Sequence, residues 1–341
     1  MGDKVLIGRL VKFGTVAAAL SVSALVLLLG WREDEFLYQL IRLTGLNDVP
    51  ANVHVMEPTQ IPWSEVRWSG DLEDPALNES SGLAASNRRS DLLWSINDSG
   101  DGPNIYAMTT AGAALGRWSI DIAKPSDWEA MDAFVLNDKN YLLIADVGDN
   151  FARRRSVSFL VVEEPDLEQD QTTTLPVAWQ VEFAYPEGPR DSEAVAVDIS
   201  AEQVLIVSKR TFPNELYAVP LRVSKASPVT AEKIAELYPL PRNVPGDEVL
   251  YGRAAPYLGM PTGMDLLGER LLITTYRDAY LYDYADVTKA PLRIPLPLAG
   301  QREAIAFARD SDATAYVSSE RKNRTEVAQI FTIDFGFAAP E

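Results

Sequence analysis

A short phrase recurs five times along this chain and constrains its fold more than any other feature. Each copy places a polar residue before a small residue and a large apolar one. The copies are Ser81-Gly82-Leu83-Ala84, Glu129-Ala130-Met131-Asp132, Glu193-Ala194-Val195-Ala196, Thr262-Gly263-Met264-Asp265 and Glu303-Ala304-Ile305-Ala306. Self-similar, strand-like units that repeat at roughly 40–50 residues are typical of the blades of a propeller.

Two further apolar runs usually follow each phrase, at intervals that fit hairpin and meander connections. The second runs lie at 92–96, 141–145, 204–208, 271–275 and 315–319, and the third, aromatic-rich runs at 105–108, 159–162, 216–219, 279–282 and 330–333. We therefore predict an all-β protein, a β-propeller of five blades over residues 63–337. Six blades stay open, because the intervals after Glu129 and Glu193 are long enough for an extra strand.

The segment before the first phrase also reads as a strand. Residues 62–68 (Pro-Trp-Ser-Glu-Val-Arg-Trp) alternate apolar and polar side chains, which is the pattern of a half-buried strand. We expect this strand to pair with the last blade, after the run 330–335, and so to close the ring. Closure removes two open sheet edges that would otherwise be free to pair with other chains.

The N-terminus carries a predicted membrane segment. Phe13–Trp31 contains no charged residue and is long enough to cross a bilayer as a helix of about 20 residues. Basic residues precede it and acidic residues follow it, so residues 1–12 are expected in the cytoplasm and the propeller in the periplasm or outside the cell. Residues 25–32 lack a small-x-small cleavage site, which favours an uncleaved signal-anchor over a signal peptide. Residues 32–62 then read as an amphipathic extension and a linker.

Composition excludes several classes of site. The chain has no cysteine, so thiolate chemistry and cysteine zinc sites are excluded. Its single histidine, His54, lies in the linker, which excludes a Ser-His-Asp triad in the propeller. The net charge of −18 argues against nucleic acid as a partner. Any chemistry must therefore use carboxylates, Lys, Arg, Tyr, Ser or a hard metal ion.

Residues at equivalent repeat positions become neighbours around the channel of a propeller. The five residues at one such position therefore form a ring. At the first phrase position three of five residues are carboxylates, namely Glu129, Glu193 and Glu303. The ends of the second runs form another ring, with an acidic part in the first two blades and a cationic part in the later ones. The acidic residues are Asp98, Asp101, Asp146 and Asp149, and the others are Lys209, Arg210, Tyr276, Arg277 and Arg321. If both rings meet at one rim, the mouth has a carboxylate half and a cationic half.

Converging carboxylates raise one another's pKa unless a cation joins them, and carboxylate oxygens at Gly-rich turns suit Ca²⁺. We predict a Ca²⁺ site in which the ligands are Asp98, Asp101, Asp146, Asp149 and Glu193. Local hydrogen bonding in turns is the alternative for these aspartates. Lys209, Arg210, Arg321 and Tyr276 are predicted to hold an anionic ligand, with ion pairing to the facing glutamates as the alternative.

The phrases with their flanking residues resemble the phytase-like, or esterase-like, β-propeller group, which is distantly similar to β-propeller phytases. The likeness covers about residues 78–337. It rests on Glu79 to Ala84, Trp94 to Gly100, Asp127 to Met131, Asp146 to Asn150, Asp191 to Asp198 and Glu303 to Phe307. For true phytases the resemblance implies Ca²⁺ ions that bridge carboxylates to substrate phosphates. This chain departs from that pattern, because Lys209 and Arg277 stand where acids would be needed.

Two functions remain open from the sequence. The first is a membrane-anchored, exported propeller that binds a divalent cation and an anionic small molecule, as a Ca²⁺-assisted phosphoester hydrolase with Glu129, Glu193, Glu303 and Arg277 as its catalytic residues. The second is a non-catalytic module that binds an envelope component through its rim loops.

Overall fold

The computed structural model describes ten stretches of the chain, all within 52–341. They are residues 58–59, 64–98, 100–224, 228–242, 244, 247, 255, 257–297, 301–321 and 327–336. The predicted cytoplasmic N-terminus (1–12), the membrane segment (13–31) and nearly all of the extension (32–62) lie outside the described residues. Within the described stretches, no helix has the length and apolar character that crossing a bilayer requires.

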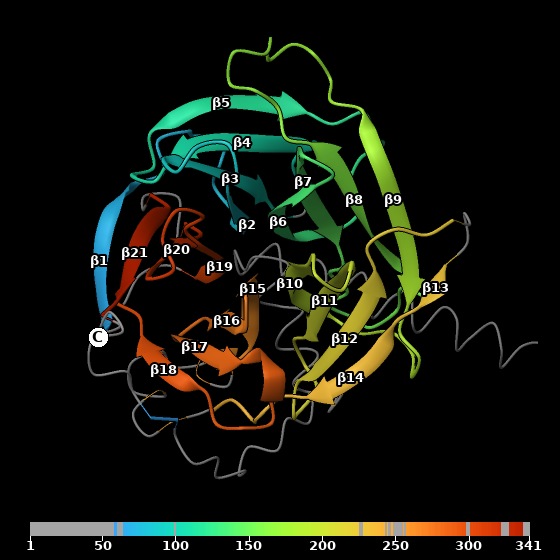
Figure 1. Cartoon of the computed structure of the whole chain (residues 1–341), viewed down its shortest axis with the longest axis vertical. Helices are drawn as coiled ribbons and strands as arrows, with labels where there is room; N and C mark the ends of the chain where they lie inside the picture. The colour runs from blue at the N-terminus through green and yellow to red at the C-terminus, as the bar shows by residue number, and fades with distance from the viewer. Residues whose placement is uncertain are drawn as a thin grey trace, which may run out of the picture. The chain divides into compact units, whose positions relative to one another are not determined.

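Five sheets make up the fold, and each is one blade with its strands in order from the channel outward (Figure 1). Blade 1 has β2 (Ser80–Ala85), β3 (Leu92–Asn97), β4 (Asn104–Thr109) and β5 (Ala114–Ser119). Blade 2 has β6 (Trp128–Leu136), β7 (Lys139–Asp146), β8 (Val157–Glu163), β9 (Val177–Ala184) and the short β13 (Val229–Thr230). Blade 3 has β10 (Ser192–Asp198), β11 (Gln203–Ser208), β12 (Glu215–Pro220) and β14 (Glu232–Glu236). Blade 4 has β15 (Pro261–Leu267), β16 (Arg270–Thr275), β17 (Asp278–Asp283), the 3-10 helix η2 (Tyr284–Asp286) and β18 (Leu292–Pro295), and blade 5 has β19 (Arg302–Phe307), β20 (Thr314–Ser319), β21 (Gln329–Phe335) and β1 (Ser64–Asp71).

The five recurring phrases form the innermost strands, which confirms the five-bladed reading. Each inner strand contacts the inner strands of its two neighbours, in the cyclic order β2, β6, β10, β15, β19. The long interval after Glu193 supplies β13, which pairs parallel with β9 as a fifth strand of blade 2. Among the described residues this extra strand joins an existing blade, and it builds no sixth one.

The first strand of the propeller closes the ring, as the alternating pattern predicts. β1 pairs antiparallel with β21, with Ser64 opposite Phe335 and Val66 opposite Ile333. Blade 5 therefore takes three strands from the end of the chain and one from its beginning. The closure covers an edge of β21 that would otherwise be open.

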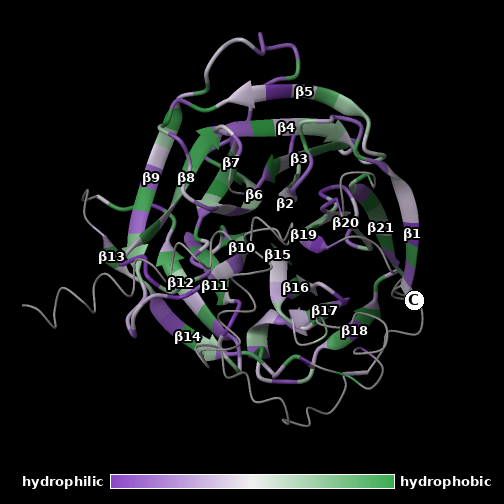
Figure 2. Cartoon of the chain, turned by 180° about the vertical axis from the view of Figure 1, so that it is seen from behind, coloured by the Kyte–Doolittle hydropathy of each residue, from purple (hydrophilic) through white to green (hydrophobic). Residues whose placement is uncertain are grey.

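The core lies between the blades. Five hydrophobic clusters each join residues of two adjacent blades. Inner and second strands are buried on both faces, so they read as continuous apolar runs such as Leu92–Asn97. Outer strands face water on one side, and β14 alternates exposed with partly buried residues. Figure 2 shows the contrast, with hydrophobic colour along β8 and hydrophilic colour on β14.

A β-bulge occurs at the same place in every blade. The pairing register between the first two strands shifts across the first phrase residue in all five sheets. The residues at the five bulges are Ser81, Glu129, Glu193, Thr262 and Glu303. A bulge inserts one unpaired residue and redirects its side chain, so the fold presents this phrase position at one end of the channel in each blade.

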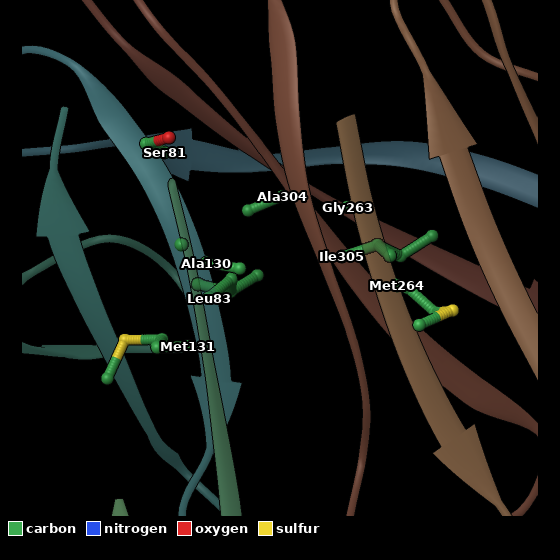
Figure 3. A pocket seen from close by; sticks show the side chains of 9 residues that line it. Ser81, Leu83, Ala130, Met131, Gly263, Met264, Ala304 and Ile305 are labelled. Atoms are coloured by element: carbon green, nitrogen blue, oxygen red, sulfur yellow. The ribbon is translucent and has the colours of Figure 1, made fainter. Parts of the chain in front are cut away.

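Close approach of the inner strands explains the small second residue of the phrase. A Cβ atom on Gly82 would lie 2.8 Å from the Met131 nitrogen, and one on Gly263 would lie 2.9 Å from the Ala304 Cα. Below the bulges the channel narrows to a cavity of about 10 Å³, lined by phrase residues of β2, β6, β15 and β19 (Figure 3), which is room for about one water. A ligand larger than a water molecule does not fit this cavity.

Candidate functional site

Three glutamates meet at the bulged end of the channel. Glu129, Glu193 and Glu303 are 4–6% exposed, although an ionised carboxylate is costly to bury. Burial and the negative charge of Glu193 hold the pKa of both Glu129 and Glu303 well above the usual range. The sequence placed these side chains together by repeat alignment, and the structure brings them to the same mouth.

More acidic residues join them from the adjoining loops. We call the whole group the acidic mouth, and the negative charges in it raise the pKa values of Asp127, Glu129, Glu193 and Glu303. It consists of Asp98, Asp127, Glu129, Asp191, Glu193, Glu303 and Glu320.

Backbone hydrogen bonds repeat from blade to blade and set which residues reach the mouth. The residue after the second strand donates its N–H to the carbonyl two residues before the bulge. These bonds run from Asp98 to Glu79 (3.0 Å), from Lys209 to Asp191 (2.8 Å) and from Glu320 to Gln301 (2.7 Å). The positions equivalent to Asp98 are therefore Lys209 and Glu320, and strand pairing adds Tyr276 in blade 4.

Asp98, Asp127 and Glu129 form a group with the geometry of a metal site. Each offers a carboxylate oxygen, and the three oxygens lie within 4.8 Å of one another. Burial, followed by the charges of Asp98 and Asp191, raises the pKa of Asp127 to about 7. A divalent cation would relieve this repulsion. The donors are all hard oxygens, which fits Ca²⁺ or Mg²⁺ rather than a soft metal.

Gly148 leaves room for two of these carboxylates. A Cβ atom built on it would lie 2.4 Å from an oxygen of Asp127 and 2.6 Å from an oxygen of Glu129. Its own N–H donates to the Asp127 carbonyl at 3.3 Å. Any larger residue at this position would push the carboxylates out of place, so the glycine shapes the candidate metal site.

Lys209 occupies the other half of the mouth. Its ammonium is ion-paired with Glu193 Oε1 and donates to Tyr276 Oη at 2.9 Å. Burial raises the pKa of Glu193 to about 7 even though the Lys209 charge acts in the opposite direction. Among the described residues, Glu193 Oε2 accepts no hydrogen bond. This half therefore combines a cation with an unsatisfied carboxylate oxygen.

The guanidinium of Arg210 is engaged by other residues of the protein. It is ion-paired with Asp191 and donates to Asn150 Oδ1. Asp191 also accepts from the Asp149 N–H at 3.0 Å, while Asp149 itself accepts from the Arg154 N–H at 2.7 Å. Asp149 thus orders the loop after β7, and its carboxylate is outside the metal group.

The structure also separates Asp146 and Asp101 from the metal group. Asp146 pairs opposite Trp128, one position earlier than Asp98 in its own blade. It accepts from the N–H groups of Ser126 and Asp127 and pairs with Arg154 at 2.6 Å. Asp101 accepts from Tyr106 Oη at 2.6 Å. The turn-forming alternative describes both residues, because a shift of one residue reverses the direction of a strand side chain.

Two of the predicted site arginines, the catalytic candidate Arg277 and the anion-binding candidate Arg321, are engaged with the protein. Arg277 is 7% exposed; it is ion-paired with Asp247 and with Asp278 at 2.8 Å. Arg321 donates to the Pro75 carbonyl at 3.3 Å. The cationic half predicted for the rim thus reduces to Lys209 and Arg210 at the mouth itself.

Sequence reasoning missed three members of the mouth as site residues. They are Asp127, Asp191 and Glu320. Asp127 and Asp191 each stand two residues before a bulge glutamate, in the repeated pattern Asp-x-Glu. That repetition was a usable signal, because it places a second carboxylate at the equivalent position of two adjacent blades.

Comparisons with known proteins give no family. No protein-family model matches the chain, and no curated protein matches it. Solved structures similar to it include a luciferin-regenerating enzyme, at 8% identity, TM-score 0.42 and coverage of 81% of this chain and 96% of that one. A PQQ-bound aldose sugar dehydrogenase from Streptomyces coelicolor is 12% identical, with a TM-score of 0.41 and coverage of 82% of this chain and 99% of that one. A gluconolactonase from Xanthomonas campestris is 12% identical, with a TM-score of 0.43 and coverage of 84% of this chain and 98% of that one.

Proposed function

We propose that the acidic mouth binds a divalent cation, preferably Ca²⁺, and through that ion an anionic small molecule, and that the protein is a metal-dependent phosphoester hydrolase. One observation carries this proposal: the convergence of Asp98, Asp127 and Glu129 within 4.8 Å. The close approach of three carboxylates without a cation is electrostatically unfavourable. A bound cation would therefore reduce the repulsion between the carboxylates of this site.

The anion would bind between the metal group and Lys209. A bound Ca²⁺ would supply polarisation of a phosphoryl oxygen and a lowered pKa for water. Lys209 is positioned to stabilise negative charge that develops on the ester. Glu193 Oε2, which accepts no hydrogen bond within the described residues, is the oxygen that can take a proton, and its pKa of about 7 suits a general base near neutral pH.

The phytase-like resemblance fits this proposal with one difference. Its multiple Ca²⁺ ions require more acidic ligands than this mouth provides beside Lys209. We therefore propose a substrate with one phosphate or a similarly small anionic group at the mouth, rather than a densely phosphorylated one.

The predicted signal-anchor would place the mouth outside the cytoplasm, where extracellular Ca²⁺ modules function with dissociation constants of roughly 10⁻⁴–10⁻³ M. Intact spheroplasts treated with protease test this placement. Digestion of the propeller together with survival of the N-terminal sequence is the expected result, and a protected propeller would contradict it.

Calorimetry on the full-length chain tests the metal site, and a phosphoester panel with and without Ca²⁺ tests the reaction. We expect Ca²⁺ binding in the wild type and none in Asp127→Asn. We expect turnover that requires Ca²⁺ and is lost in Glu193→Gln. Ca²⁺ binding without turnover of any phosphoester would exclude the hydrolase.

That last outcome would favour the second candidate, a binding module for an envelope component. The loop after β7 supports it, because Phe151 is 44% exposed and the Arg153 guanidinium lies 5.0 Å from the centre of its ring. An exposed aromatic residue with an arginine on a rim is a common feature of binding surfaces.

A further inference from the structure

The half of the acidic mouth away from the metal group contains a buried lysine. The Lys209 side chain is 3% exposed, and lysine is almost never buried to this extent unless it is paired. Its ammonium contacts Glu193 and Tyr276, and its backbone N–H is fixed by Asp191. The chain therefore holds one positive charge at a set place inside a ring of carboxylates.

The field of this charge reaches all three bulge glutamates. Lys209 opposes the rise in pKa of Glu129, of Glu193 and of Glu303. The charge of Arg210 also opposes the rise in the pKa of Glu193. The Lys209 charge thus acts on carboxylates of three blades, and its ammonium contacts that of Glu193 directly.

This half of the mouth has more acceptor capacity than one ammonium uses. Glu193 Oε2 is buried and accepts no hydrogen bond from the described residues. Glu303 and Glu320 are joined by Gln301, whose amide donates to Glu303 Oε1 at 3.0 Å and to Glu320 Oε2 at 2.9 Å. Glu193, Glu303 and Glu320 supply hard oxygen donors of the kind that a divalent ion takes, although among the described residues only the metal group already has its oxygens within 4.8 Å of one another.

We propose that Lys209 is a tethered cation that occupies a second cation position in the mouth, formed by Glu193, Glu303 and Glu320, and that it limits the protein to one divalent ion. This inference rests on the proposed metal site at Asp98, Asp127 and Glu129. A second Ca²⁺ beside the ammonium would meet strong repulsion at a separation of a few ångströms. Removing the ammonium should leave a carboxylate cluster that captures a divalent ion in its place.

Ca²⁺ titration of the full-length chain, by calorimetry and by equilibrium dialysis, tests this inference. The wild type should bind one Ca²⁺ per chain and Lys209→Met should bind two, a doubling. Lys209→Gln should also bind two, since its amide can still donate to Glu193. Lys209→Arg keeps the charge and should bind one.

Lys233→Met is the matched control. Lys233 lies in the same blade and also pairs with two carboxylates, Glu215 and Glu236, each at 2.9 Å, but it stands on the outer strand β14. The Lys233→Met substitution removes the same charge far from the channel, so this variant should still bind one Ca²⁺ per chain.

Each outcome is decisive. One Ca²⁺ in both the wild type and Lys209→Met overturns the tethered cation and leaves the proposed metal site standing. If the wild type binds no Ca²⁺ and Lys209→Met binds one, the proposed metal site is overturned and the role of Lys209 is supported. None in either protein overturns both. If both neutral variants fold poorly, Ca²⁺ at millimolar concentration should restore their folding, and failure to do so also overturns the inference.

Discussion

The two ends of the channel use the same strands and the same residue type for different purposes. At the acidic mouth, seven carboxylates surround Lys209 and Arg210. About 10 Å further along the inner strands, by the usual rise per residue, Asp132 and Asp265 share Arg309, with distances of 2.8 and 3.2 Å. We call these three residues the Arg309 bridge.

Both carboxylates of the Arg309 bridge have hydrogen-bond partners in the protein, although Arg309 Nε itself has none among the described residues. Asp132 also accepts from the N–H groups of Ala133 and Val197, and Asp265 from those of Leu266 and Phe307. The mouth lacks such completion, because Glu193 Oε2 accepts no hydrogen bond from the described residues. Removing one partner of a buried ion pair is strongly destabilising, whereas a buried charge that already lacks a partner is a cost that a ligand can remove. The comparison thus separates a structural cluster from a binding cluster.

The largest expected effect is at the Arg309 bridge. Arg309→Met leaves two buried aspartates without their shared cation, and breaking a buried ion pair in this way costs about 3–5 kcal/mol. Urea denaturation should show a loss of that size. Arg67→Met is the control, since the Arg67–Asp334 pair is largely exposed and such pairs are worth about 0–1 kcal/mol. Equal losses in the two variants would remove the distinction between the bridge and a surface ion pair.

The next effect is on metal binding. Ca²⁺ at 100 times its dissociation constant should stabilise the wild type by about 2.7 kcal/mol, which is a rise in melting temperature of roughly 5 °C for a domain of this size. Asp127→Asn should abolish that rise. Asp132→Asn, at the other end of the channel, should keep it. Loss of the rise in both variants would show that the two ends are not independent.

The pH dependence of the Ca²⁺ effect sharpens the comparison. Burial raises the pKa of Asp127 and of Glu193 to about 7 in the folded protein, above the ordinary values of roughly 4. Between these values the folded chain binds more protons than the unfolded chain, so metal-free stability should fall as pH rises from about 4 to 7. Ca²⁺ binds the deprotonated forms, so the stability it adds should grow over the same range.

Urea midpoints measured at pH 5 and at pH 8, with and without Ca²⁺, check this. The pKa of Asp132 in the Arg309 bridge is also raised to about 7, by burial and by Asp265. Ca²⁺ should not alter the contribution of Asp132 to the pH dependence of stability. A Ca²⁺ increment that is the same at both pH values would contradict the assignment of the ion to the mouth.

The smallest expected effect is from Gly148→Ala. Its methyl group would overlap Asp127 and Glu129, and overpacking of this kind costs about 1–3 kcal/mol. Ca²⁺ affinity should fall by about tenfold, which is about 1.4 kcal/mol. Gly102→Ala is the control, because its Cβ would meet the side chain of Asn104 at 3.0 Å rather than a carboxylate of the mouth. Unchanged Ca²⁺ affinity in Gly148→Ala would place the ion elsewhere.

The hydrophobic pattern and the recurring phrase were enough to predict the blades and their order. Strands buried on both faces are continuous apolar runs, so β3, β7, β11, β16 and β20 were predictable from hydrophobicity alone, and the phrase located the inner strands. Most outer strands were not, because a half-exposed strand such as β9 carries a weaker pattern. β1 was the exception, since its alternation was clear enough to predict the closure.

Which polar residues meet became known only from the three-dimensional arrangement of the blades. The repeat placed Glu129, Glu193 and Glu303 in one ring, but the bulge at each of them and the register of one residue separate Asp98, in the metal group, from Asp146, in a turn. Arg277 and Lys209 follow equivalent strands, yet one is paired with Asp247 and Asp278 and the other reaches the channel. The physical reason is that hydrophobic periodicity is local, whereas charge pairing depends on distances between blades that no local pattern encodes.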